Sequence, residues 1–351
     1  MKTEWIDNNQ QCTMNNVQWK KVKLGDCLTI GNGQDYKHLQ SGDIPVFGTG
    51  GVMTFVDTFL YDGETVCIGR KGTINKPMYY NGKIWTVDTL FYTHSFLNVL
   101  PKFIYYVFCN IDWNKYNEAT GVPSLSKETI YKIEISIPYL PVQRRIAAIL
   151  SSADKVIAST QKVIDKLKQI KQGMMDDLLK PKDGWRMVKL GEVYNFQYGD
   201  GNKNPNNNGD YPIYGANGII GGYTKFNAVD SVVIGHMGEY AGSVIWANGK
   251  HFVTYNGTIT IVKDNNSLYD RFGYFVLLNL DIKKICAGSG QPFLSYDTLN
   301  KIEISIPDLA EQSRIASILS GIDSKIAAEE KVLEKYKAVK KGLMEKLLNG
   351  K

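Results

Sequence analysis

The heptapeptide Lys132-Ile133-Glu134-Ile135-Ser136-Ile137-Pro138 recurs unchanged at residues 301–307, 169 positions further along a chain of 351 residues. The likeness continues after it, where QRRIAAIL at 143–150 matches QSRIASIL at 312–319. It also reaches back, because residues 19–26 and 44–48 match residues 185–192 and 211–215. Self-similarity at a nearly fixed period indicates duplicated structural units. The chain is therefore predicted to hold two copies of one fold, which agree at their ends and differ in their middles.

Each copy ends in a segment with heptad spacing of apolar residues, over residues 139–181 and 308–351. This pattern predicts two helices of about 40 residues, each ~60 Å long. Asp308 and Glu311 form a capping-box signature at the start of the second helix, and Pro181 ends the first. We predict that the helices pack on each other, antiparallel if the copies obey a pseudo-two-fold axis. The alternative is that each helix packs only on its own domain.

The remaining stretches, 1–138 and 182–307, are predicted to be globular. Short β-rich runs at 65–68 and 231–234 end at glycines, and 103–108 and 272–280 are typical of short buried helices, although strands also fit. The predicted fold class is mixed α/β. Two domains are joined by two long α-helices packed as an antiparallel coiled coil, with a pseudo-two-fold internal repeat.

Composition excludes several classes of protein. With 43% hydrophobic and 22% charged residues the chain is not mostly disordered. It has no run of ~18 apolar residues, so no membrane span is expected. The polar N-terminus lacks a signal-peptide core, and the five cysteines form no C-x-x-C pair. A disulfide framework or zinc site is thus not expected, and a cytoplasmic location is predicted.

The net charge of +6 lies entirely on the helical segments. Residues 139–181 carry 8 basic and 4 acidic side chains, residues 308–351 carry 9 and 7, and each globular stretch is balanced. Affinity for nucleic acid would therefore need local basic patches, or basic surface from a partner.

The sequence shows no catalytic signature. It has no P-loop and no [ND]-P-P-[YFW] tetrapeptide, and none of its four histidines lies four residues from another histidine or a cysteine. We therefore predict no catalytic, cofactor-binding or metal-binding residues. A duplicated chain of this kind is more typical of a binding protein or scaffold than of an enzyme.

The order of these elements resembles the specificity (S) subunit of type I restriction-modification enzymes over nearly the whole chain. Each copy has a strand-rich domain, then Lys-Ile-Glu-Ile-Ser-Ile-Pro, Gln-x-x-Ile-x-x-Ile-Leu, a long helix and Gly-[Leu/Met]-Met-x-x-Leu-Leu. The resemblance implies that the domains are target recognition domains, each recognising one half of a bipartite asymmetric site in double-stranded DNA. It implies that the helices set the spacer and dock two methyltransferase (M) subunits, which restriction (R) subunits join.

The same resemblance implies that this chain is a non-catalytic DNA-recognition subunit and carries no cofactor itself. S-adenosylmethionine, for methylation of adenine N6, and ATP with Mg²⁺, for translocation and cleavage, are then expected on the partner subunits.

The differing middles of the domains are where two different half-sites would be recognised. In the first domain Arg70 suits guanine, Gln34 or Asn75 suits adenine, and the lysines suit phosphates. In the second domain the aligned turn at 235–240 lacks both basic residues, and its partner loop is rich in Asn. The candidates are Gln34, Tyr36, Lys37, Arg70, Lys71, Thr73, Asn75, Lys76, Asn202, Lys203, Asn204, His236 and Tyr240.

Each candidate has a plainer alternative. The loops can be solvated turns whose glycines serve only the backbone, and His236 can be an ordinary exposed side chain. The aromatic residues at 36, 47, 55, 214 and 223 fit core or turn packing better than base stacking. Asp154, Lys155, Asp323 and Lys325 are expected to be solvated on the helices.

Two other functions stay open. One is a specificity partner of a two-subunit restriction enzyme whose other chain fuses methylase and nuclease. The other is a duplicated carbohydrate-binding or adaptor protein, which the Asn, Gly and Tyr content would suit. The sequence does not give the DNA target, the spacer length or the stoichiometry.

Overall fold

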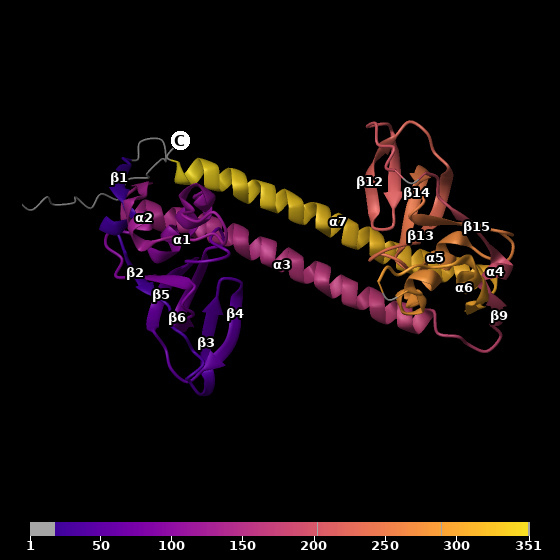
Figure 1. Ribbon diagram of the computed structural model, residues 1–351, viewed down its shortest axis with the longest axis horizontal. Coiled ribbons are helices and arrows are strands. Elements are labelled where there is room, and N and C mark those ends of the chain that lie inside the picture. Colours follow the sequence, from indigo (N-terminus) through magenta and orange to yellow (C-terminus); the bar gives the residue numbers. More distant parts are fainter. Residues whose placement is uncertain (1–17, 202, 289, 350–351) are drawn as a thin grey trace, which may run out of the picture. The chain divides into compact units, whose positions relative to one another are not determined.

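The computed structural model describes residues 18–201, 203–288 and 290–349, and it divides into two compact units (Figure 1). The first unit combines Met1–Gln161 with Val332–Lys351, and the second is Lys162–Lys331. Two long helices, α3 (Leu140–Leu178) and α7 (Leu309–Leu348), each contribute to both units. The C-terminal part of the chain is thus a structural component of the first unit.

The globular parts of the units repeat one order of elements. The first contains β1 (Lys20–Lys23), η2 (Leu24–Asp26), β2 (Thr29–Asn32), β3 (Ser41–Gly48), β4 (Gly51–Val56), β5 (Tyr61–Gly69), β6 (Met78–Thr86), β7 (Leu90–His94), α1 (Pro101–Asn110), η3 (Trp113–Tyr116), α2 (Lys127–Lys132) and β8 (Glu134–Ile137). The second contains β9 (Arg186–Lys189), α4 (Leu190–Val193), β10 (Tyr194–Tyr198), β11 (Tyr211–Gly215), β12 (Gly218–Tyr223), β13 (Ala228–Gly235), β14 (Val244–Val253), β15 (Gly257–Val262), α5 (Asp270–Asn279), η4 (Ile282–Ile285), α6 (Tyr296–Lys301) and β16 (Glu303–Ile306). The runs at 103–108 and 272–280 are helical, α1 and α5, rather than strands.

Each unit has a six-stranded mixed sheet and a two-stranded antiparallel sheet. The strand order is β2-β7-β5-β6-β3-β4 in the first unit and β10-β15-β13-β14-β11-β12 in the second. All neighbours pair antiparallel except β3 with β6 and β11 with β14, which are parallel. The identical topology confirms the duplication and the mixed α/β class.

The repeated heptapeptide forms the second strand of each small sheet. Strand β8 pairs with β1, and β16 pairs with β9 in the same register. Ile135 and Ile137 are buried whereas Glu134 is exposed, the alternation expected of a strand with one face on the core. Pro138 follows and the chain turns into α3. The string therefore recurs because it connects each domain to its long helix.

The glutamine of each Gln-x-x-Ile motif fastens the start of the long helix to the domain. Gln143 is fully buried, its Oε1 accepts from the Leu100 amide at 2.9 Å, and its Nε2 donates to the Asn98 and Pro138 carbonyls at 3.0 and 2.8 Å. Gln312 makes the equivalent three bonds, to Tyr269 and to the carbonyls of residues 267 and 307. Each buried amide is thereby satisfied, as the cost of an unpaired buried polar group requires.

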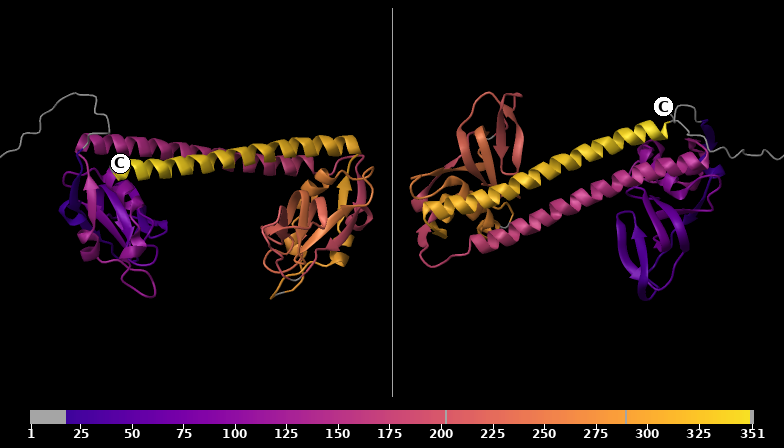
Figure 2. Two further views of the ribbon diagram at one scale, coloured as in Figure 1. Left: turned by 90° about the horizontal axis from the view of Figure 1, so that it is seen from above. Right: turned by 180° about the vertical axis from the view of Figure 1, so that it is seen from behind.

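Residues of both long helices enter the core of each unit. In the first unit Ile146 and Leu150 of α3 and Leu347 and Leu348 of α7 belong to one buried cluster with α1. In the second unit Met175 of α3 and Ile315 and Leu319 of α7 do the same with α5. The helices lie side by side in both views of Figure 2, which confirms the predicted pairing and excludes helices that pack only on their own domains.

Ion pairs between the helices show their antiparallel direction and repeat with the fold. Asp154 of α3 pairs with Lys340 of α7 at 2.5 Å, and Asp323 of α7 pairs with Lys171 of α3 at 2.6 Å. All four side chains are no more than a third exposed. The expectation that Asp154 and Asp323 are solvated is therefore wrong, because each carboxylate meets a lysine of the other helix. Lys155 and Lys325 are exposed, as expected.

The capping box at the start of α7 is half formed. Asp308 Oδ1 accepts from the Glu311 amide at 2.8 Å, the bond of an N-cap. The Glu311 carboxylate instead accepts from Arg314 Nε and Nη2, both at 2.7 Å, and lies 4.0 Å from Lys182 Nζ.

In the described part of the chain, no helix is both long and apolar enough to cross a lipid bilayer.

We predict that reversing one charge of the Asp323–Lys171 pair destabilises the protein and that reversing both restores it. An exposed ion pair contributes ~0–1 kcal/mol to stability, whereas breaking a fully buried pair costs ~3–5 kcal/mol. The Asp323–Lys171 pair is partly covered, so its contribution is expected to lie between these limits. Lys171→Glu should therefore lower the free energy of unfolding by ~1–2 kcal/mol, measured by denaturant unfolding, and Lys171→Glu with Asp323→Lys should recover most of it.

The control is Lys337→Glu, which alters the exposed Lys337–Glu334 pair within α7. That change should cost under ~0.5 kcal/mol. Equal losses for the two single variants, or no recovery in the double variant, would contradict a role of the pair in fixing helix register.

Candidate nucleic-acid interface

Four segments of the first unit meet at one end of its large sheet, and we call them the first loop end: residues 32–37, 69–76, 86–90 and 123–127. The Gln34 amide donates to the Thr86 carbonyl at 2.8 Å, and the Arg70 amide donates to the Thr89 carbonyl at 2.8 Å. The Gly72 amide donates to the Pro123 carbonyl at 2.8 Å. The structure therefore brings together the two loops that the sequence singled out, on the turn between β6 and β7.

Backbone bonds hold these loops, so their side chains are free to face outward. Gln34, Lys37, Arg70, Lys71, Thr73, Asn75 and Lys76 are all exposed. Ile74 is 2% exposed and anchors the 69–76 loop in the core. Gly72 has φ +86°, a conformation that L side chains rarely adopt, and it makes the turn that presents the flanking residues. Tyr36 differs, because it is partly buried against the cluster of β3, β4 and β6.

Two cations of the first loop end share one ring. The Arg70 guanidinium carbon lies 5.9 Å from the centroid of Phe91, and Lys127 Nζ lies 6.0 Å from it. Lys127 is the first residue of α2, whose N-cap Ser126 accepts from the Thr129 amide at 3.1 Å. A local basic patch thus exists in a unit whose globular part is neutral overall. Sequence analysis did not select Lys127, which lies 57 residues beyond Arg70.

The second unit builds the same frame from residues 198–201, 235–240, 253–257 and 292–296, the second loop end. The Asp200 amide donates to Val253, the His236 amide to Asn256, and the Gly238 amide to Pro292, at 2.9, 2.7 and 2.8 Å. Each bond has its counterpart in the first loop end, and Gly238 repeats the positive φ of Gly72. The backbone is therefore common to both units and the side chains differ.

His236 stands at the position of Arg70 but is 6% exposed. Its Nδ1 lies 2.8 Å from the Leu294 carbonyl, and its ring centroid lies 4.0 Å from that of Tyr198 and 5.6 Å from that of Tyr255. The expectation of an ordinary exposed side chain is wrong for His236, because rings distant in sequence close over it. Tyr240 in the same turn is 37% exposed.

The Asn-rich loop of the second domain is held by its own side chains. Asn204 Nδ2 donates to the Ile220 carbonyl of β12 at 3.0 Å, and Asn204 Oδ1 accepts from the Asn206 amide at 3.1 Å. Asn206 Oδ1 accepts from the Gly222 amide at 3.1 Å. The amide of Asn204 is thus engaged with the β11–β12 hairpin, whereas Lys203 is exposed. Asn202 lies outside the described residues.

The second loop end carries rings that sequence analysis did not select. The rings of Tyr198 and Tyr296 are stacked with centroids 4.0 Å apart, and Tyr255 lies 5.7 Å from Tyr198. Burial raises the pKa values of Tyr198 and Tyr296, so both phenols keep their protons at neutral pH. Tyr296 begins α6 at the position that Lys127 has in α2. An alignment of the two copies in sequence would have shown this exchange of a lysine for a tyrosine.

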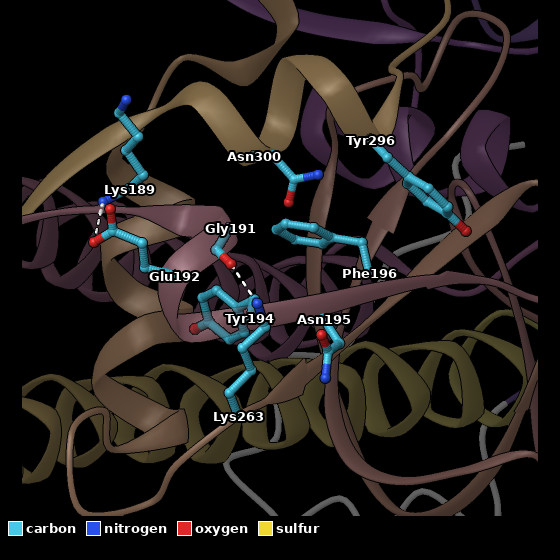
Figure 3. A pocket seen from close by; sticks show the side chains of 9 residues that line it. All are labelled: Lys189, Gly191, Glu192, Tyr194, Asn195, Phe196, Lys263, Tyr296 and Asn300. Atoms are coloured by element: carbon cyan, nitrogen blue, oxygen red, sulfur yellow. Dashed lines mark hydrogen bonds between the residues drawn. The ribbon is translucent and has the colours of Figure 1, made fainter.

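A hollow of about 450 Å³ lies beside Tyr296 in the second unit (Figure 3). Its lining is Lys189, Gly191, Glu192, Tyr194, Asn195, Phe196, Lys263, Tyr296 and Asn300. In the first unit Tyr131 stands at the place of Asn300, and its hydroxyl accepts from the Ile30 amide at 2.8 Å. The shorter Asn300 leaves open the space that a phenol ring fills in the other copy.

Within the described ranges, no three His, Cys, Asp or Glu side chains converge as a metal site would require.

The fold and the paired loop ends define a duplicated recognition protein. Residues 16–169 and 182–338 both match the family described as the type I restriction modification DNA specificity domain. The chain therefore belongs to the type I restriction-modification specificity subunits, and it is a DNA-recognition subunit rather than a catalytic one. Among its relatives is the type I restriction enzyme MjaVIII specificity subunit of Methanocaldococcus jannaschii, 26% identical over 353 aligned positions that cover 83% of this chain and 78% of the relative.

Solved structures share the fold. The type I restriction-modification S subunit of M. genitalium superposes with a TM-score of 0.74 at 20% identity, covering 95% of this chain and 97% of that one. A chain from a study of complex assembly and conformational transition in a type I restriction-modification system gives 0.56 at 17% identity, covering 94% and 97%. These likenesses extend over the helices as well as the domains.

We predict that alanine destabilises the protein at position 236 but hardly at the aligned position 70. His236→Ala removes a buried ring and leaves a cavity among Tyr198, Tyr255 and Leu294, so the free energy of unfolding should fall by ~2–3 kcal/mol. Arg70→Ala removes an exposed side chain and should change it by less than ~0.5 kcal/mol. Denaturant unfolding of the full chain measures both, and a larger loss for Arg70→Ala would contradict the assigned burial.

Proposed function

We propose that each loop end recognises one half of a bipartite, asymmetric site in double-stranded DNA. The observation that carries this is one backbone frame presented twice with different side chains, Arg70 and Lys71 in one copy and His236 and Met237 in the other. A common frame suits one way of docking on a duplex, and different side chains suit different bases. The target recognition domains are then residues 1–138 and 182–307, with 139–181 and 308–351 as spacer helices.

Within this proposal the exposed candidates take separate roles. Arg70 fits bidentate contact with guanine, and Gln34 and Asn75 fit adenine. Lys37, Lys71, Lys76 and Lys203 fit phosphates, which position the protein without selecting sequence. Thr73 and Tyr240 are exposed beside them, whereas Tyr36 and His236 are covered and support the loops.

We propose further that the helix pair sets the number of unread base pairs and docks two methyltransferase (M) subunits. The support is that the unchanged repeat, Lys132–Pro138 and its counterpart at 301–307, lies at the connections between domains and helices. The helix starts that follow it are closely similar in the two copies. A surface present twice suits a partner present twice. Restriction (R) subunits would join that core, with S-adenosylmethionine and ATP with Mg²⁺ bound by the partners and none by this chain.

The deciding experiment compares methylated adenines, by sequencing, in cells with and without the gene. Loss of one bipartite motif on deletion, and its return on complementation, is the expected result. Complementation with Arg70→Ala should relax specificity in one half of the motif only, by about 5- to 150-fold, because one base contact is worth ~1–3 kcal/mol.

Lys115→Ala is the matched control, since Lys115 is an exposed cation in η3 of the same unit that pairs with Asp112, outside the loop end. It should leave the motif unchanged. An unchanged methylome on deletion would reject the function, and an equal loss on all sequences for Arg70→Ala would assign Arg70 to a phosphate.

The spacer role predicts a change in gap length when the helices are lengthened. One added base pair displaces the far half-site by ~3.4 Å and rotates it by ~35°, so a stiff pair of helices tolerates one gap length. Seven residues inserted into both α3 and α7 keep the heptad phase and should shift the gap in the methylated motif, with both half-sites intact. An insertion between the exposed residues Asn265 and Asn266 is the control. An unchanged gap after lengthening of both helices would refute the role.

A further inference from the structure

The two loop ends differ systematically in chemistry at positions that the backbone aligns. In the first unit these positions hold Arg70, Lys71, Asp88, Ser124 and Lys127. In the second they hold His236, Met237, Tyr255, Phe293 and Tyr296. Three cations and a carboxylate are thus replaced by rings and a thioether. Lys71 forms an isolated bridge with Ser124, and Met237 forms the same bridge with Phe293, so the alignment is structural.

Three rings of the second unit, Tyr198, Tyr255 and Tyr296, pack together, and Phe293 is held in the same loop end by its bridge with Met237. We call Tyr198, Tyr255, Phe293 and Tyr296 the aromatic group. Tyr198 lies between Tyr296 and Tyr255, with centroid distances of 4.0 and 5.7 Å. Tyr255 is 38% and Phe293 is 43% exposed. His236 is buried against Tyr198 and Tyr255, and its ring contacts the Leu294 carbonyl. A supported, partly exposed apolar cluster marks an interaction site more than a solvated turn.

We propose, on the basis of the function assigned above, that the aromatic group recognises thymine through its C5-methyl group, whereas the first loop end recognises its half-site through charged contacts. The substrate feature that the second unit selects is thus an apolar group on the edge of an A·T pair. Tyr255 and Phe293 make the contact. Tyr198 and His236 pack against Tyr255, Tyr296 stacks on Tyr198, and the bridge with Met237 holds Phe293 in place.

The chemistry of the duplex limits which groups of the DNA an aromatic side chain can contact. Aromatic stacking on bases needs unpaired bases, because paired ones present only their edges in the grooves. In the major groove the one apolar group among those edges is the thymine methyl, for which aromatic side chains such as Phe are suited. Guanine selection through its O6 and N7 favours Arg or Lys, and the aligned positions of the second unit hold neither.

The test uses the complex purified after co-expression with its methyltransferase partner, and duplexes carrying the motif found by methylation sequencing. Thymines are replaced one at a time by uracil, which lacks only the methyl group. At one or more positions of a single half-site, uracil should weaken binding by about fourfold, the fold-change that corresponds to ~0.8 kcal/mol for one buried CH₂ group. The other half-site should bind with no more than about a twofold change.

Variants identify the residues responsible. Tyr255→Ala and Phe293→Ala should abolish the preference for thymine over uracil at the sensitive positions while leaving the other half-site unchanged. Tyr269→Ala is the matched control, because Tyr269 is an aromatic residue of the same unit, 44% exposed and outside the loop end. It should keep the full preference, and unfolding measurements on each variant separate loss of contact from loss of fold.

The outcomes separate this inference from the function on which it rests. If no bipartite site is bound at all, the proposed function fails. If the site is bound but uracil costs nothing at any position, or if Tyr255→Ala and Phe293→Ala both retain the thymine preference, the function stands and the inference is overturned. Uracil sensitivity that Arg70→Ala removes and Tyr255→Ala does not would place thymine recognition in the first unit and equally overturn it.

Discussion

The apolar stripes of α3 and α7 must be covered along nearly 40 residues, and each helix covers the other. Because of this pairing, both helices contribute residues to the core of each unit. Ile146 and Leu150 of α3 enter the core of the first unit beside Leu347 and Leu348 of α7, and the second unit repeats the arrangement with Met175, Ile315 and Leu319. The Asp154–Lys340 and Asp323–Lys171 pairs fix the register of the stripe, because a shift of one turn would leave four partly covered charges unpaired.

The domains combine a constant frame with variable side chains. The frame consists of main-chain bonds between loops, such as Arg70 with Thr89 and His236 with Asn256, which are indifferent to side-chain identity. The buried Gln143 and Gln312 then orient each domain's α1 or α5 connection on the start of its helix. Because backbone groups carry the frame, residues at the loop ends can change from cations to rings without a change of fold.

Much of this architecture follows from the sequence because it depends on local or repeated patterns. The heptad spacing gave the two helices, and the exact recurrence of seven residues gave the duplication. What could not be predicted depends on contacts between distant residues. Asp154 lies 186 positions from Lys340, and nothing in its neighbours shows that the two meet. His236 has the local sequence of a solvated turn, and Tyr198, Tyr255 and Leu294 bury it.

The candidate site was predictable to the same degree. The Gln34 and Arg70 loops were identified from glycines and polar residues in series, and the structure places them together. Lys127 and Tyr296 were missed because each begins a short helix directly after a serine that repeats between the copies, and Tyr255 was missed because it lies in the short turn between β14 and β15. The signal that identifies them is the difference in charge between aligned positions, which has meaning only once the shared frame is known.

The first unit is discontinuous in sequence, and this has a consequence for its synthesis. Its core includes Leu347 and Leu348, whereas the second unit is one uninterrupted stretch from Lys162 to Lys331. On the ribosome the earlier-made domain therefore waits with part of its apolar surface uncovered until α7 emerges, and the later-made domain is the first to have all its residues available. Order of translation and order of completion are reversed, so a ribosome that stalls within α7 leaves the N-terminal domain, not its neighbour, open to chaperones and proteases.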